Sequence, residues 1–238
     1  MALYGAMILV MVRFLLVIAC AGWPLICQAQ QVRVALVGDS TVNDQGGWGP
    51  GFSATLPGVQ VMNFALNGRS SRSFRDEGAW AKVLASHPTY ILIQFGHNDV
   101  PGKGSERETE PQTSYRANLT RYLEEARALG ATPVLVTSIV RRNFDTQGKI
   151  KVDSLAPYVA EVRRLAAARK VPLMDLYALT LEYAERLGPE GCADIDARDK
   201  EGKRDRTHLG KKGQQEIGIL AARELARVVT LFADYLQK

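Results

Sequence analysis

The sequence predicts an α/β domain built around a parallel β-sheet. Short apolar runs alternate along the chain with longer amphipathic stretches, which is the pattern of repeated strand–helix units. The chain has 238 residues, of which 46% are hydrophobic, enough for one domain with a substantial core. Charged residues make up 23%, a share that is typical of folded proteins and that argues against wholesale disorder.

The stretch 1–29 differs in composition from the rest of the chain and is predicted to be a signal peptide. It has no acidic residue, and its single basic residue, Arg13, precedes an apolar run. Cys27 and Ala29 then supply the small residues that a cleavage site directly after Ala29 requires. We therefore expect a secreted or periplasmic protein in which residues 31–238 form a single domain without stable membrane association.

Three other interpretations of the N-terminus stay open. The segment from Met1 to Ile26 is long enough to span a membrane if it is not cleaved, although the charge in its middle opposes this. The segment Val17–Cys20 loosely fits a lipoprotein cleavage box, and Met11 is a second natural start.

Five segments have the apolar character of strands in a buried sheet. Residues 90–95 are the clearest example, because Tyr-Ile-Leu-Ile-Gln-Phe is nearly continuously apolar, as a strand buried on both faces is. The predicted strands, in chain order, are 32–37, 59–65, 90–95, 133–139 and 171–176.

Amphipathic stripes between and after these strands predict helices that pack on the sheet. The first stripe repeats every three to four residues and precedes Gly130, a helix stop signal. The stripes run over 115–126, 155–165 and 217–232. Two polar segments, 101–111 and 188–206, are long for loops, so we expect them to be functional or mobile.

Chemically useful residues follow the first three predicted strands, where ligands bind in open α/β sheets. Ser40 comes after the first strand in a Gly-Asp-Ser turn that exposes its hydroxyl. Gly68 follows the second strand, and its missing side chain lets a backbone N–H approach a ligand. Asn98 places an amide donor after the third strand.

A carboxylate and an imidazole lie three residues apart, just ahead of the last predicted helix. Asp205 can reach Nδ1 of His208 within one turn, which fixes the tautomer and leaves Nε2 as a base. Each motif alone is weak, since an Asp-x-x-His pair is more often a cap or a surface pair. Together the motifs supply a nucleophile, oxyanion donors, a base and its orienting carboxylate, which predicts nucleophilic catalysis.

These motifs resemble the four sequence blocks of the SGNH (GDSL) hydrolases: Gly38-Asp39-Ser40, Gly68, Gly96-x-Asn98 and Asp205-x-x-His208. The resemblance covers essentially all of residues 31–238 and implies a three-layer α/β/α, flavodoxin-like fold with a five-stranded parallel sheet. It implies that Ser40 is the nucleophile, His208 the general base and Asp205 its partner. The implied oxyanion hole consists of the Ser40 and Gly68 amides and the Asn98 side chain. The chain departs from the pattern at Thr41-Val42, where many members have leucine after the serine.

With this departure the segment reads Gly-Asp-Ser-Thr-Val, which is similar to the rhamnogalacturonan acetylesterase branch of the family. The similarity extends to Gly47-Trp48-Gly49 and to Asn63-x-Ala65-x-x-Gly68-Arg69-Ser70. It implies a serine esterase that removes O-acetyl groups from an acetylated polysaccharide or oligosaccharide, such as rhamnogalacturonan, through an acyl-enzyme. The alternatives are an acetylesterase for another sugar such as acetylxylan, and a lysophospholipase or thioesterase for acyl chains. A noncatalytic carbohydrate-binding protein and a nucleotide-binding protein fit the motifs less well.

Trp48, Arg69 and Arg72, which lie near the predicted site, are candidates for substrate binding. Arg69 and Arg72, together with Arg75, recur at three-residue spacing beside Gly68, and arginine grips carboxylates such as those of galacturonate. The competing interpretation is that Arg72 and Arg75 pair with neighbouring carboxylates on a helix surface. Trp48 stacks on a sugar in one interpretation and plugs the fold in the other.

Composition limits the cofactors and partners. The net charge of +5 comes without a run of like charges, so we expect no nucleic-acid partner. Cys192 is the one cysteine in residues 31–238, which leaves no internal disulfide and no cysteine metal cluster there. The three histidines lack metal-ligand spacing, and a site of His97, Asp99 and His208 is only a weak alternative. We expect a monomer that needs no metal and no other cofactor.

Overall fold

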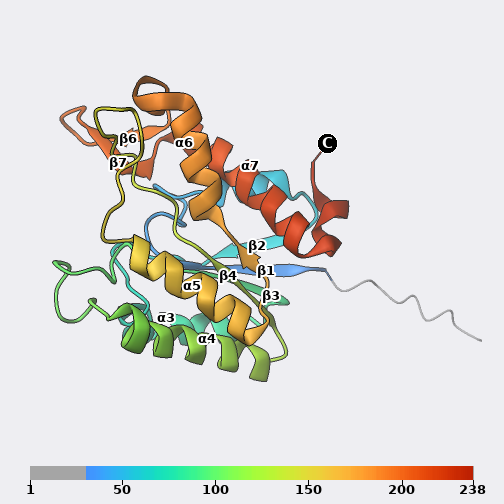
Figure 1. The fold of residues 1–238 in the computed structure, drawn as a ribbon. Coiled ribbons are helices and arrows are strands. Elements are labelled where there is room, and N and C mark those ends of the chain that lie inside the picture. The colour runs from blue at the N-terminus through green and yellow to red at the C-terminus, as the bar shows by residue number, and fades with distance from the viewer. Residues whose placement is uncertain (1–30, 238) are drawn as a thin grey trace, which may run out of the picture. The chain divides into compact units, whose positions relative to one another are not determined.

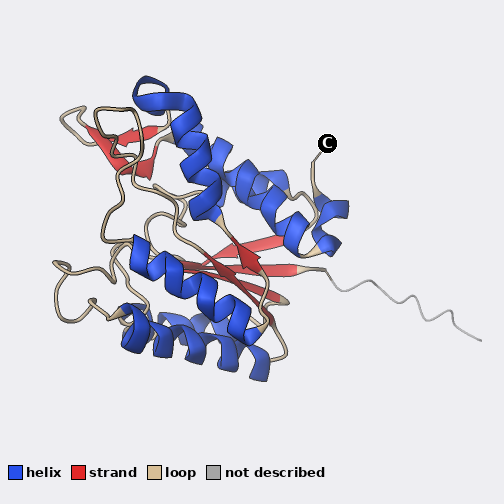
Figure 2. Ribbon diagram, in the orientation of Figure 1, coloured by secondary structure: helices blue, strands red, loops and turns tan. Residues whose placement is uncertain are grey.

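The computed structural model describes residues 31–237, in which helices cover both faces of a five-stranded parallel sheet (Figures 1 and 2). The predicted signal peptide lies outside the described residues. The strand order is β2-β1-β3-β4-β5, and every neighbouring pair is parallel. The strands are β1 (Arg33–Gly38), β2 (Gln60–Asn63), β3 (Tyr90–Gln94), β4 (Thr132–Val136) and β5 (Leu173–Met174).

The strand order reverses between β1 and β3. The chain passes from β1 outward to β2 and then returns to the other side of β1 as β3. In open α/β sheets the crevice for ligands lies at such a reversal, beyond the carboxyl ends of the strands. The segments that follow β1 and β3 carry the predicted Ser40 and Asn98.

Side chains alternate along each strand between two apolar cores, one on each face of the sheet. In β1, Ala35 and Val37 face one core, whereas Val34 and Leu36 face the other. Helices α2 (Ser73–Asp76), α3 (Ala79–Ala85), α4 (Arg116–Ala128) and α5 (Ala156–Arg169) cover the first core. The second core lies under α1 (Gly49–Thr55), α6 (Leu176–Cys192) and α7 (Lys211–Val228). The three-layer prediction is confirmed.

The segment 188–206 is not the loop that the sequence predicted. Within α6 the helix is interrupted at Gly188, where φ is 69° and ψ is 177°, and a second, short helical segment then runs to Cys192. Strands β6 (Asp196–Arg198) and β7 (Arg204–Leu209) then form an antiparallel hairpin beyond the carboxyl ends of the sheet (Figure 1). Gly188 and Pro189 end the first helical segment, but the chain does not become a loop there, because proline fits the first turn of the segment that follows.

Other boundaries differ by a few residues. The last stripe was predicted to continue to Phe232, but α7 ends at Val228 and a 3₁₀ turn, Thr230–Tyr235, carries Phe232 into the core. The segment 101–110 is irregular, as predicted, and a π-helical turn at Pro111–Tyr115 leads into α4. No helix within residues 31–237 is both long and apolar enough to cross a membrane.

Candidate active site

Ser40 lies in the tight turn that leaves β1. Gly38 ends the strand where a Cβ would lie 2.6 Å from the carbonyl oxygen of Gln94, so only glycine fits without a backbone shift. Asp39 closes the turn, since its Oδ1 accepts hydrogen bonds from the Thr41 N–H at 2.9 Å and the Thr41 hydroxyl at 2.7 Å. Ser40 is half-buried and lines a surface hollow of about 440 Å³. The turn therefore presents a hydroxyl to this hollow.

The imidazole of His208 meets the Ser40 hydroxyl from the β6–β7 hairpin. Its Nε2 lies 2.7 Å from Ser40 Oγ, and its Nδ1 lies 2.6 Å from Asp205 Oδ2. Because a carboxylate can only accept here, Nδ1 carries the proton and Nε2 is left to accept the serine proton. The strand, and not a helical turn, brings the carboxylate and the imidazole together.

The environment of Asp205 keeps its carboxyl group ionised. Partial burial by itself would raise the pKa of Asp205, but hydrogen bonds from His208 and Thr207 outweigh it and hold the pKa below its usual 3.8. The backbone N–H groups of Thr207 and His208 donate to Oδ1 at 2.9 and 3.1 Å. These bonds also fix the direction in which the carboxylate faces the imidazole.

Three hydrogen-bond donors border the same hollow as Ser40. Gly68 has φ 74°, a left-handed conformation that favours glycine. Within residues 31–237, neither the Ser40 N–H nor the Gly68 N–H has a hydrogen-bond partner. Asn98 donates one amide hydrogen to the Arg69 carbonyl oxygen at 3.2 Å, so its second hydrogen remains available. The donors can together stabilise a negative oxygen.

A buried polar chain holds the Ser40 turn from the core side. The indole Nε1 of Trp48 donates to Gln94 Oε1 at 3.0 Å, and Gln94 Nε2 donates to Thr41 Oγ1 at 2.8 Å. Thr41 passes the chain on to Asp39. This chain explains why threonine, and not leucine, follows Ser40. Trp48 is 0% exposed, so the prediction that it stacks on a sugar is wrong, and it plugs the fold.

Asp99 ties together the loops that carry Gly68 and Asn98. Its fully buried carboxyl group accepts hydrogen bonds from the hydroxyls of Ser71 at 2.5 Å and Thr109 at 2.9 Å. Burial raises the pKa of Asp99 to about 7, and these hydrogen bonds only partly oppose the rise. The loops that carry Gly68 and Asn98 are thereby anchored to one side chain.

A buried ion pair supports the hairpin that carries His208. Arg142, in the segment after β4, pairs with Asp196 of β6, and both side chains are almost fully buried. Arg204 binds the other carboxylate oxygen of Asp196 at 2.8 Å. Arg142 Nη2 also donates to the His208 carbonyl oxygen at 2.6 Å. The sequence offered one signal for this role, an Arg141-Arg142 pair at the carboxyl end of an apolar strand.

The arginines predicted to bind substrate have partners within the protein. None of them borders the hollow at Ser40. The side chains of Arg69, Arg72 and Arg75 bind, at 2.7 Å each, Glu77, the Ser105 carbonyl oxygen and Glu125, respectively. The prediction that Arg69 and Arg72 grip a substrate carboxylate is therefore not supported. The predicted helix-surface pairing of Arg72 and Arg75 with adjacent carboxylates does not occur either.

Several neighbours of Ser40 were missed from the sequence. Gln45, Gly46, Asn67 and Ala197 all border the hollow. Asn67 Nδ2 donates to Gln45 Oε1 at 2.6 Å, which gives the hollow a polar rim. A Cβ on Gly46 would lie 3.3 Å from the His208 side chain, so glycine leaves room for the imidazole. The position of Asn67, next to Gly68, was the one available signal.

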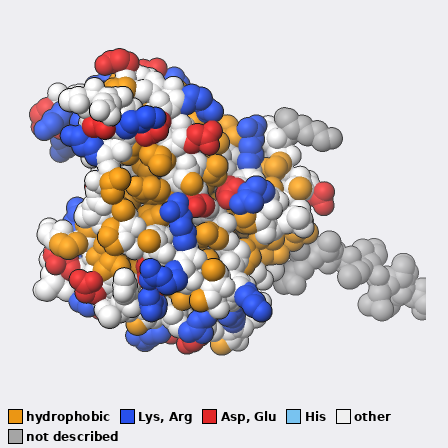
Figure 3. Space-filling model, viewed as in Figure 1, with side chains coloured by type: hydrophobic (Ala, Val, Ile, Leu, Met, Phe, Trp, Pro, Cys, Tyr) orange, Lys and Arg blue, Asp and Glu red, His pale blue; other side chains and the backbone are white. Residues whose placement is uncertain are grey.

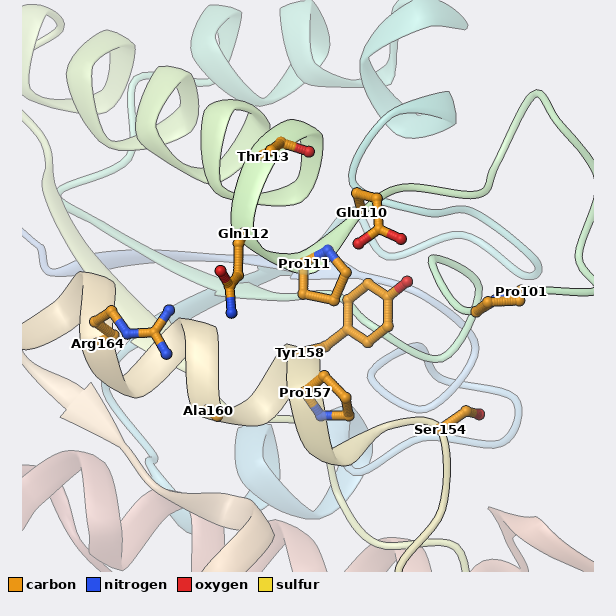
Figure 4. Close-up of a pocket in the computed structure, with 10 residues that line it drawn as sticks. All are labelled: Pro101, Glu110, Pro111, Gln112, Thr113, Ser154, Pro157, Tyr158, Ala160 and Arg164. Atoms are coloured by element: carbon orange, nitrogen blue, oxygen red, sulfur yellow. The ribbon is translucent and has the colours of Figure 1, made fainter.

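A separate hollow of about 590 Å³ lies between the segment 101–113 and α5 (Figure 4). Three prolines and the ring of Tyr158 form much of its wall, with Glu110 and Arg164 among the charged residues that border it. None of the predicted site residues borders it. The Ser40 hollow is therefore the one that combines the predicted catalytic groups.

Sequence comparisons place the chain among esterases. The model of the GDSL-like lipase/acylhydrolase family matches residues 33–216. The rhamnogalacturonan acetylesterase RhgT of Bacillus subtilis is 36% identical over 86% of this chain and 94% of its own length. The rhamnogalacturonan acetylesterase of Emericella nidulans is 32% identical over 73% of this chain and 78% of its own length.

Solved structures share the fold. Protein YxiM of Bacillus subtilis has a TM-score of 0.71 at 25% identity, and the match covers 83% of this chain but only 56% of YxiM. The acetylxylan esterase Axe2 of Geobacillus stearothermophilus has a TM-score of 0.62 at 18% identity, over 82% of this chain and 94% of Axe2. The predicted resemblance is confirmed, and the chain belongs to the GDSL-like lipase/acylhydrolase family.

Proposed function

We propose that this protein is a serine esterase that removes O-acetyl groups from a pectic polysaccharide such as rhamnogalacturonan. As a member of its family the chain is a carboxylic ester hydrolase. The observation that carries the proposal is the hydrogen-bonded line from Ser40 Oγ through the His208 imidazole to Asp205, with distances of 2.7 and 2.6 Å. These are the distances at which a base takes a proton from a hydroxyl.

The first half of the reaction forms an acyl-enzyme. Ser40 Oγ attacks the acetyl carbonyl carbon while His208 Nε2 takes the hydroxyl proton. The carbonyl oxygen becomes negative and is stabilised by the N–H groups of Ser40 and Gly68 and by the Asn98 amide. These donors are already in place, so no solvent needs to reorganise as the charge develops. Collapse breaks the bond to the sugar oxygen, which receives the proton from the imidazolium.

The second half releases acetate. Water attacks the acyl-enzyme, His208 takes its proton, and the same donors stabilise the second oxyanion. Asp205 stays ionised throughout and stabilises the imidazolium that forms in each half. Collapse returns the proton to Ser40 Oγ and frees the acid.

Two observations support an acetylated sugar as substrate over a long acyl chain. Two relatives that each cover at least 80% of this chain are named a rhamnogalacturonan acetylesterase and a probable rhamnogalacturonan acetylesterase. The hollow at Ser40 has a rim of polar side chains, Gln45, Asn67 and Asn98, which suit sugar hydroxyls. A series of p-nitrophenyl esters of increasing acyl length tests the distinction: we expect the acetyl ester to be preferred, and a preference for long acyl groups contradicts the proposal.

Acetate release tests the proposal directly. We expect the purified protein to release acetate from acetylated rhamnogalacturonan faster than from acetylated xylan, and Ser40→Ala to abolish the release. A fluorophosphonate probe labels the wild-type serine and not the Ser40→Ala variant. Ser53→Ala, at an exposed position on α1, is the matched control and keeps both properties. Wild-type activity in Ser40→Ala would refute the assignment of the nucleophile.

We also propose that the chain is exported, with residues 1–29 as a cleaved signal peptide. The support is the Arg13-containing apolar segment and the small residues at 27 and 29. Mass spectrometry of the mature protein checks this, since cleavage gives an N-terminus at Gln30. An intact N-terminus on the exported protein contradicts it.

A further inference from the structure

A second hollow adjoins the one at Ser40. It has a volume of about 680 Å³ and is bordered by residues of the β6–β7 hairpin together with Asn143. Asp205 borders both hollows, so the second begins at the catalytic carboxylate. A polymer with one sugar at Ser40 therefore has a neighbouring concave surface along which to continue.

Two of the cations on this second hollow have no counterion among residues 31–237. Lys203 and Arg206 are exposed, and within residues 31–237 neither side chain lies within ion-pair distance of a carboxylate. Arg204 differs, because it is bound to the buried Asp196 at 2.8 Å. Figure 3 shows basic side chains gathered over this end of the molecule, with acidic ones among them.

The carboxylates that border the hollow are already bound. Asp199 Oδ1 accepts the backbone N–H groups of Glu201 at 3.1 Å and Lys203 at 2.8 Å, which closes the hairpin turn. Asp205 is engaged with the His208 imidazole. Among the described residues neither carboxylate forms an ion pair with Lys203 or Arg206, so a negative ligand group meets the two cations without displacing a protein ion pair.

Neutral polar groups complete the lining. The Asn143 amide and the Thr207 hydroxyl border the hollow, and among the described residues neither side chain makes a hydrogen bond. A sugar offers hydroxyls that match such donors and acceptors. The combination of free cations and free neutral groups is what a charged sugar requires, whereas an acyl chain requires an apolar wall.

We propose that this hollow is a subsite for a uronate residue of the oligosaccharide whose acetylated residue occupies the Ser40 hollow. The planar guanidinium of Arg206 binds the sugar carboxylate through two hydrogen bonds, and Lys203 adds a second positive charge. Asn143 and Thr207 bind ring hydroxyls. The subsite rests on the proposed function, and it assigns carboxylate recognition to Lys203 and Arg206 in place of Arg69 and Arg72, which are bound to other groups.

The test compares anionic and neutralised substrates. The variants are Arg206→Gln, Lys203→Gln and the double variant, and Lys82→Gln, exposed on α3, is the matched control. The substrates are acetylated pectic oligosaccharide, the same material with its carboxylates methyl-esterified, and p-nitrophenyl acetate. For each protein, kcat/KM on the oligosaccharide is divided by kcat/KM on p-nitrophenyl acetate, so that any general change in catalysis cancels.

We expect this ratio on the anionic substrate to fall about tenfold in Arg206→Gln and further in the double variant, mainly through KM. On the methyl-esterified substrate we expect the same ratio for the wild type and all variants. The Lys82→Gln control keeps the wild-type ratio on both substrates. High salt reduces the difference in this ratio between the wild type and the variants on the anionic substrate, because salt screens exposed charges. Unacetylated oligogalacturonate inhibits hydrolysis of p-nitrophenyl acetate by the wild type more strongly than by the double variant.

Two outcomes overturn the subsite, and they are distinguishable. Suppose that the wild type deacetylates the oligosaccharide. If the double variant then keeps the wild-type ratio, or if its ratio falls equally on the anionic and the methyl-esterified substrate, the carboxylate subsite is wrong while the proposed function stands. If the wild type hydrolyses p-nitrophenyl acetate but releases acetate from neither oligosaccharide, the proposed substrate fails and the subsite fails with it.

Discussion

The side chain of Arg142 holds the backbone of His208. Its Nη2 donates to the His208 carbonyl oxygen at 2.6 Å while its Nε pairs with the buried Asp196. The backbone N–H of Arg142 donates to the Arg206 carbonyl oxygen at 2.9 Å. The segment after β4 is therefore joined to the strand that carries both Asp205 and the imidazole, and it sets where that strand lies relative to Ser40.

Replacing Arg142 is expected to lower both stability and turnover. Arg142→Met removes one partner of the buried Asp196 carboxylate, which keeps Arg204 as its other partner, and loss of such a hydrogen bond to a charged group costs about 1.5–3 kcal/mol of unfolding free energy. Because Arg142 touches no reacting atom, we expect kcat on p-nitrophenyl acetate to fall and KM to change little. Urea denaturation and steady-state kinetics, below the unfolding transition of every variant, measure the two effects.

Two companion variants separate positioning from general destabilisation. Arg142→Lys keeps the charge but cannot reach both partners at once, so we expect partial recovery of kcat. Arg223→Met, at an exposed position on α7, is the matched control and keeps wild-type values. A folded Arg142→Met variant with unchanged kcat would show that the hairpin needs no such support.

The Asn98 side chain is expected to act on the transition state. Asn98→Ala removes an amide that borders the Ser40 hollow, and loss of one oxyanion donor lowers kcat about 10²–10³-fold. KM changes little, because the donor matters most when charge develops on the carbonyl oxygen. Slow but complete labelling by a fluorophosphonate confirms an intact nucleophile. A loss of less than about tenfold places the oxyanion elsewhere.

Trp48 is expected to matter for stability and not for sugar binding. Trp48→Phe removes the donor to Gln94 and leaves a buried oxygen without its partner, which costs about 1–3 kcal/mol. Urea denaturation measures this loss. Because the buried ring cannot contact a sugar, we expect KM for acetylated rhamnogalacturonan to stay within about twofold of the wild-type value. A variant of full stability with a raised KM would restore the sugar-stacking interpretation.

Asp99 is expected to make stability depend on pH. Burial raises its pKa to about 7 in the folded state, against a usual value of 3.8. The folded protein thus holds a proton that the unfolded chain loses above roughly pH 4. Its contribution to the unfolding free energy is complete below that pH and is lost as pH rises to about 7, at up to about 1.4 kcal/mol per pH unit.

The variant Asp99→Asn isolates this effect, because its amide resembles the protonated acid and does not titrate. We expect the unfolding free energy of the wild type, minus that of the variant, to fall between pH 4.5 and 7 and then level off. Asp234→Asn, which removes an exposed carboxylate near the C-terminus, serves as the control for the loss of one charge. A difference for Asp99→Asn that does not change with pH would contradict burial as the cause.

The parallel strands were predictable because their apolar character is local. Strands β1, β3 and β4 are continuous apolar runs, and each lies within the range that the sequence predicted or within one residue of it. Helix α1 was missed because Gly49-Pro50-Gly51 resembles a loop. In the structure a Cβ on Gly51 would lie 2.3 Å from the backbone of α7, so glycine is there for close packing of two helices. From the sequence alone, a glycine required for close helix packing cannot be distinguished from a glycine in a turn.

The sequence by itself determined which chemical groups this protein has, and in what order: a serine, a glycine and an asparagine that are candidate oxyanion donors, and an aspartate three residues before a histidine. Their spacing to the ends of strands is local information, and it was enough to predict the nucleophile, the base and the family. It was not enough for the hairpin that carries the base, because β6 and β7 are held by the distant Arg142.

Only the tertiary structure decided which similar side chains are free. Arg69 and Arg206 look alike in the sequence, yet Arg69 lies 2.7 Å from Glu77, whereas Arg206 borders a hollow without a carboxylate partner among the described residues. Likewise, Trp48 between two glycines gave no sign of its hydrogen bond to Gln94. Burial and pairing depend on contacts between residues that are far apart in the sequence, and these contacts exist only after the sheet and helices have packed.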